Sequence, residues 1–133
     1  MNMGMANDSD VAWGQNIMKN CKEIVKYMYQ DGITIVAGTD MGFPGYSLDR
    51  ELELYVDAGL TPMEAIQTAT ITPARVMNKE SVSGSIEAGK QADIIIVDGD
   101  PLENIRDVRK VSTVIKDGNI YDPATLHHIA GFQ

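Results

Sequence analysis

Two patterns of apolar residues follow one another in the first part of the chain. Between residues 13 and 30 the apolar side chains recur at the spacing of one α-helical face, and they are Ile17, Cys21, Ile24, Val25 and Met28. Residues 33–37 are a short, largely β-branched run between two glycines, and this pattern predicts a buried parallel strand. A helix that leads into such a strand is typical of α/β proteins.

Three helix-start signals follow this strand. Ser47 or Asp49 can cap a helix that ends near residue 58. Residues 61–64 form a capping box with a proline at the first helical position. Thr72, again followed by a proline, repeats the signal for a short helix. These signals predict a run of short helices.

The pattern changes at Ser81, where turn residues alternate with short apolar runs. Asp117 and Gly118 are a strong hairpin signal between two of these runs. The predicted strands are 92–97, 111–116 and 119–121. The chain therefore divides into a loose N-terminal segment (1–12), an α/β part (13–80), a β-rich part (81–122) and a tail (123–133).

Composition narrows the class of protein. The chain has 133 residues, of which 44% are hydrophobic, and 11 basic against 19 acidic residues give a net charge of −8. An acidic chain without a basic cluster does not favour a nucleic-acid binder. No apolar run is long enough to cross a membrane, and the first residues have no signal-peptide pattern. The single cysteine, Cys21, fits a reducing compartment such as the cytoplasm, and we expect it in the core.

Asp40 is the first candidate for a functional residue. It comes just after the predicted strand, the position where α/β barrels place catalytic and metal-binding groups. A carboxylate there could bind a divalent cation and take a proton from a bound water molecule. The local sequence Thr-Asp-Met-Gly is also good chemistry for an Asx-turn, and local residues alone favour that simpler interpretation.

Two further motifs are interpreted as structural. Residues 84–90 match the start of a phosphate-binding loop, but Gln91 replaces the required hydroxyl residue and a strand follows instead of a helix. This segment is predicted to be a turn. His127 and His128 are adjacent, so their side chains point to different sides and make a poor metal pair. We expect both in a solvated tail.

Several segments, in order and spacing, resemble the C-terminal part of the amidohydrolase superfamily, in particular imidazolonepropionase-like and Xaa-Pro dipeptidase-like metal hydrolases. The segments that carry the resemblance are 32–40, 50–66, 69–74, 84–102 and 114–118. It implies the C-terminal segment of a (β/α)8 TIM barrel, with the last strand at 33–37 and flanking helices, followed by part of a small β-sandwich. It also implies that the loop of residues 41–46 lines the substrate mouth.

The resemblance implies a chemistry as well. Asp40 matches the aspartate that binds the metal and accepts the proton of the attacking water, and the metal is zinc or a similar divalent cation. Family members hydrolyse amide, cyclic amide or dipeptide C–N bonds in small molecules. The family's His-x-His and its other ligands have no counterpart here, and a complete barrel takes about 250 residues. We therefore expect a fragment that is inactive by itself.

An unpaired barrel strand has a physical consequence. Its backbone groups and apolar faces require neighbours, which a second copy or a missing N-terminal half could supply. This predicts self-association through residues 13–60. The alternative to an enzyme fragment is a non-catalytic α/β module that acts through self-association or protein binding.

Overall fold

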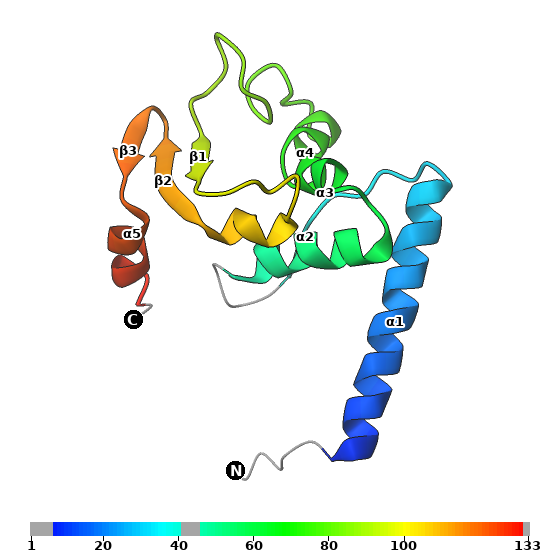
Figure 1. Cartoon of the computed structure of the whole chain (residues 1–133). Helices are drawn as coiled ribbons and strands as arrows, with labels where there is room; N and C mark the ends of the chain where they lie inside the picture. Colours follow the sequence, from blue (N-terminus) through cyan, green and yellow to red (C-terminus); the bar gives the residue numbers. More distant parts are fainter. Residues whose placement is uncertain (1–6, 41–45, 132–133) are drawn as a thin grey trace.

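The computed structural model describes residues 7–40 and 46–131 (Figure 1). The chain begins with helix α1 (Asp8–Gln30), which extends away from the other elements along much of its length. Asn7 caps this helix, because its side-chain oxygen accepts hydrogen bonds from the amides of Ser9 and Asp10 at 2.9 and 3.0 Å. The prediction of a loose segment at 1–12 is therefore wrong for residues 8–12, where capping rather than apolar periodicity starts the helix. Residues 1–6 lie outside the described residues.

Three helices follow α1 and form the centre of the structure. They are α2 (Tyr46–Ala58), α3 (Pro62–Thr68) and α4 (Ile71–Val76). The predicted capping box at α3 is confirmed, because the Glu64 carboxylate accepts from the Thr61 amide at 2.7 Å and the Thr61 hydroxyl accepts from the Glu64 amide at 3.3 Å. Ser47 and Asp49 lie inside α2, so neither is the N-cap that the sequence suggested.

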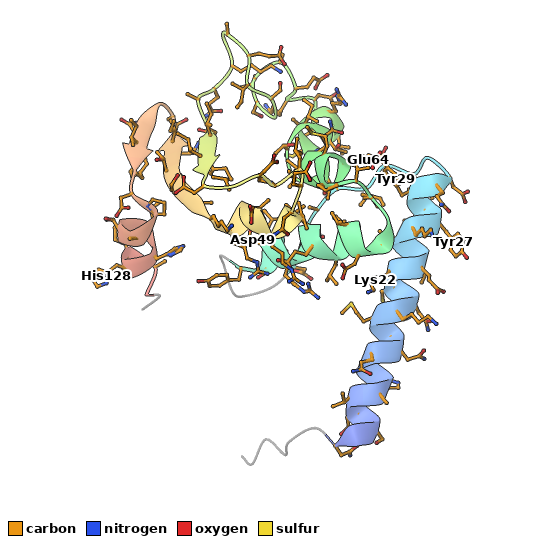
Figure 2. The ribbon with its side chains drawn as sticks, in the orientation of Figure 1. Lys22, Tyr27, Tyr29, Asp49, Glu64 and His128 are labelled. Atoms are coloured by element: carbon orange, nitrogen blue, oxygen red, sulfur yellow. The ribbon has the colours of Figure 1, made fainter. Side chains whose placement is uncertain are left out.

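Polar side chains connect α1 to this centre, and Figure 2 labels Lys22, Tyr29 and Glu64 among them. Lys22 pairs with Asp57 of α2 at 3.8 Å. Tyr29, near the end of α1, donates a hydrogen bond to Glu64, and this bond together with burial raises the pKa of Tyr29 above its ordinary value. Cys21 is exposed, which corrects its predicted place in the core. Too little of the chain covers the apolar face of α1 to bury it.

The β-rich part is an antiparallel sheet with the strand order β1-β2-β3. Its strands are β1 (Ile94–Val97), β2 (Val111–Lys116) and β3 (Asn119–Tyr121). Asp117 and Gly118 have φ angles of 51° and 77°, so the predicted hairpin turn is confirmed. Asp93 supports this turn, because its carboxylate accepts from the Asp117 amide at 2.9 Å and pairs with Lys116 at 2.8 Å.

A small core joins the helices to the segment between β1 and β2. Its buried residues are Leu52, Ala65, Ile105 and Val108, of which the last two lie on the short 3-10 helix η1 (Ile105–Arg109). Beside them Glu53 is also buried, and its two carboxylate oxygens accept from Arg50 and Arg109 at 2.7 Å each. Glu53 therefore ties α2 to η1 and, through η1, to the sheet.

The predicted strand at 33–37 is not formed, and residues 33–40 have no regular secondary structure. Within the described residues, the amides of Thr34, Ile35 and Val36 have no hydrogen-bond acceptor. A strand needs a neighbour along its edge, and the described chain offers none.

The predicted tail is also corrected, because Pro123–Ile129 forms helix α5. Asp122 caps this helix, since its carboxylate accepts a hydrogen bond from the Thr125 amide at 2.9 Å.

The ion pair of Glu53 gives a direct test of this architecture. We expect Arg109→Met to lower the free energy of unfolding by about 1.5–3 kcal/mol, the range for a hydrogen bond to a charged group, because it leaves a buried carboxylate with one partner fewer. Denaturant unfolding followed by circular dichroism measures the change. The matched control is Arg106→Met, which removes an exposed arginine of the same helix and should have little effect.

The pH dependence of that loss follows from Glu53. Burial raises the pKa of Glu53, but hydrogen bonds from Arg109 and Arg50 outweigh burial and hold it below the ordinary value. A carboxylate of lowered pKa stabilises the fold above its unfolded pKa, and the stabilisation is lost as the pH falls through the folded pKa. The difference between wild type and Arg109→Met should therefore shrink in acid. A difference that stays constant down to the acid-unfolded state would contradict this account.

Candidate functional site

The candidate site is the end of the irregular segment that leads from α1 to Asp40. Two hydrogen bonds anchor this segment shortly before it reaches Asp40. The Ala37 amide donates to the carbonyl oxygen of Thr68 in α3 at 2.9 Å, and the Gly38 amide donates to Oε1 of Glu51 in α2 at 3.0 Å. Helix α3 therefore holds Ala37 and helix α2 holds Gly38, which lies two residues before Asp40.

Asp40 itself is exposed and has a φ angle of 46°. Aspartate is among the few residues that tolerate this left-handed conformation, so the backbone fits the turn interpretation of the sequence. Exposure also leaves the carboxylate accessible to a ligand. Residues 41–45 of the loop predicted to line a substrate mouth lie outside the described residues.

Glu51 is a residue of this region that sequence reasoning missed. Its Oε1 accepts from the Gly38 amide and also from the Tyr55 hydroxyl, at 2.5 Å. Its Oε2 is buried and has no hydrogen-bond partner among the described residues. Burial and the carboxylate of Glu51 raise the pKa of Tyr55 above its ordinary value. The i,i+4 spacing of Glu51 and Tyr55 could have suggested their contact, but nothing local indicated Gly38.

The other sequence candidates lie elsewhere. Residues 84–90 form turns, and Lys90 contacts Ser85 and Glu87 at 2.5 and 2.9 Å, so its ammonium group is already engaged. This confirms the turn prediction. His127 and His128 are exposed, as expected, although they lie on α5 and not in a tail.

A small cavity lies beside α5. It has a volume of about 250 Å³ and is lined by residues of α2, η1, the sheet and α5, among them Asp49, Arg109 and His127. Burial raises the pKa of Asp49 above its ordinary value, and the nearby Arg109 partly offsets this effect. The cavity therefore sets a carboxylate near the guanidinium that also holds Glu53.

The described residues do not make a metal site by themselves. Among them, no group of three or more histidine, cysteine, aspartate or glutamate side chains is close enough to hold a metal ion. A catalytic zinc ion takes about three protein ligands and a water molecule. Asp40 could supply one of these ligands, and the described part of the chain does not supply the rest.

Comparison with known proteins identifies the family of the chain. The Amidohydrolase family profile matches residues 14–121. The chain belongs to the amidohydrolase family. It is 36% identical over 95 residues to an ochratoxinase of Aspergillus niger. The aligned segment covers 68% of this chain and 20% of that protein. It is 35% identical over 101 residues to an imidazolonepropionase of Alkaliphilus oremlandii. The aligned segment covers 70% of this chain and 24% of that protein.

The solved structures agree with the sequence relatives. A Xaa-Pro dipeptidase crystallised with methionine in its active site superposes with a TM-score of 0.71 at 38% identity, over 76% of this chain and 25% of the dipeptidase. The amidohydrolase resemblance inferred from the sequence is therefore confirmed. This chain spans about a fifth to a quarter of the length of these three relatives. No helix among the described residues is long and apolar enough to cross a membrane.

The backbone at Asp40 can be tested directly. We expect Asp40→Val to lower the free energy of unfolding by about 1–2 kcal/mol, because a β-branched side chain is strained at a φ of 46°. Asp40→Asn should leave stability unchanged, since asparagine tolerates the same conformation. Thermal unfolding compares the two, with Asp31→Val as the control at a residue whose φ is −79°. Equal stability of the valine and asparagine variants at residue 40 would show that this turn is not formed in solution.

Proposed function

We propose that this chain supplies Asp40 to the divalent-metal site of an amidohydrolase that hydrolyses C–N bonds in small amide, cyclic amide or dipeptide substrates. The observation that carries the proposal is the family match over residues 14–121, which includes Asp40 and the helices that anchor its segment. Enzymes of this family are hydrolases of C–N bonds, and the three relatives named above bear the names of such small-molecule enzymes or dipeptidases.

Asp40 has the properties that this role needs. Its carboxylate is a hard oxygen ligand of the kind that divalent cations accept, and its exposure leaves it open to a metal, a water molecule and a substrate. Zinc, when bound, lowers the pKa of a coordinated water molecule toward neutrality. A carboxylate beside that water can accept its proton. The remaining ligands have to come from residues beyond those described, so we expect the 133-residue chain to be inactive by itself.

A chimeric enzyme tests this proposal. Residues 14–121 of this chain would replace the corresponding segment of the Xaa-Pro dipeptidase. We expect the chimera to bind metal and hydrolyse an Xaa-Pro dipeptide, and we expect Asp40→Asn to lower the rate by about 100-fold or more, as for the loss of a general base. Asp31→Asn is the matched control, because Asp31 lies at the other end of the same segment.

Two results would contradict the proposal. One is an Asp40→Asn chimera that is as active as its parent. The other is a folded chimera that contains no metal although Asp40 is intact, which elemental analysis of the purified protein detects.

A second candidate function is non-catalytic, and exposed apolar side chains favour it. Within residues 13–60, α1 exposes Trp13, Ile24 and Tyr27, and the irregular segment exposes Ile33 and Val36. Several large apolar side chains exposed in one region are typical of a surface that makes protein contacts. We propose that the isolated chain self-associates through this region, either as a homo-oligomer or in place of a contact with other parts of a larger barrel.

Dilution measures this self-association. We expect the wild-type chain to sediment as an oligomer that dissociates at low concentration, and we expect Ile24→Glu combined with Val36→Glu to shift it to monomer. Ile86→Glu is the control, because Ile86 is 80% exposed and lies outside residues 13–60. A wild-type chain that stays monomeric and cooperatively folded at every concentration would exclude self-association.

A further inference from the structure

Glu51 occupies an unusual position for a carboxylate in this fold. It lies on α2, away from the ion pairs that tie α2 to η1, and its Oε1 accepts hydrogen bonds from two donors, the Gly38 amide at 3.0 Å and the Tyr55 hydroxyl at 2.5 Å. We propose that Glu51 is a positioning residue for Asp40: its carboxylate, oriented by Tyr55, fixes the backbone of residues 38–40 and thereby the direction of the Asp40 side chain. The inference rests on the function proposed for Asp40.

Water can replace the bond between Glu51 and Gly38, which is the first argument for a positional role. Gly38 is exposed, so water could satisfy its amide if Glu51 were absent. The bond therefore stabilises the fold less than a hydrogen bond between two buried groups. It does, however, fix the distance between α2 and the segment that ends at Asp40.

The second argument is that Glu51 carries a cost. Its Oε2 is buried without a partner among the described residues, and a buried polar oxygen left without a donor destabilises the folded state. A leucine of similar size would avoid this cost. Glu51 carries this cost and yet holds a segment next to a candidate ligand. This combination is typical of a site selected for geometry over stability.

The third argument is proximity along the chain. Only Thr39 separates Gly38 from Asp40, and at about 3.3–3.6 Å per residue this short link transmits any shift of the Gly38 peptide to Asp40. Asp40 also has the constrained φ of 46°. The hydrogen bond from Ala37 to Thr68 holds the preceding residue, and the bond from Gly38 to Glu51 holds the peptide two residues before Asp40.

The test compares backbone order and stability in the 133-residue chain. The double variant Glu51→Leu/Tyr55→Phe removes both the carboxylate and the hydroxyl that would otherwise lose its partner. We expect the NMR order parameters of residues 38–40 to fall from about 0.85 to below about 0.6, the values of rigid and flexible backbone. We expect the thermal midpoint to be no lower than that of the wild type, because a buried unpartnered oxygen has been removed.

Two controls make the outcome specific. Glu51→Gln keeps a side-chain carbonyl that can accept from Gly38 and Tyr55, so it should restore the order of residues 38–40. Glu23→Leu makes the same kind of replacement at an exposed position of α1 and should change neither measurement. The Gly38 amide proton signal should move in the double variant and stay near its wild-type position in Glu51→Gln.

Either of two results would overturn the inference. Unchanged order parameters in the double variant would show that Glu51 does not fix the segment. A loss of order throughout α2, together with a lower thermal midpoint, would show that Glu51 is a structural residue of the helix core. Neither measurement involves metal or substrate, so a failure here is separate from a failure of the dipeptidase chimera, which tests the function of Asp40.

Discussion

One buried carboxylate holds the two halves of this chain together. Glu53 lies in α2 and accepts from Arg50 of the same helix and from Arg109 of η1, and burial makes each bond necessary, since an unpaired charge in that position would be costly. The apolar core beside it is small, with Leu52 and Ala65 facing Ile105 and Val108. The relative placement of the helices and the sheet therefore depends on a polar contact as much as on apolar packing.

The candidate site depends on the same helix. Two glutamates in the same turn of α2 make different contacts: Glu53 binds Arg109 of η1, whereas Glu51 binds the Gly38 amide before Asp40. If the Glu53 contact aligns α2, it also fixes the point from which Glu51 reaches the segment. The contact with the core and the contact with the candidate site are therefore made two residues apart on one helix.

The sequence predicted the parts of the fold whose cause is local. The Thr61 capping box and the Asp117–Gly118 turn are determined by a few adjacent residues, and the structure forms both. The local capping signal of Asn7 was present but missed, and the strand prediction failed because its cause lay elsewhere. Ile33 and Val36 read as a strand, but a strand needs a partner edge that the described chain does not supply. Asp40 could be singled out because it follows that apolar run, whereas Glu51 could not, because its contact with Gly38 spans 13 positions.

The direction of the hydrogen bonds along residues 33–40 explains how the chain can define a site without completing it. The bonds at Ala37 and Gly38 point toward α3 and α2, inside the described structure. The amides of Thr34, Ile35 and Val36, by contrast, find no acceptor there. The described chain therefore holds residues 37 and 38, whereas the amides of residues 34–36 remain open to a further acceptor. The matched segments make up only about a fifth to a quarter of these relatives, so most of each relative's length lies outside the match.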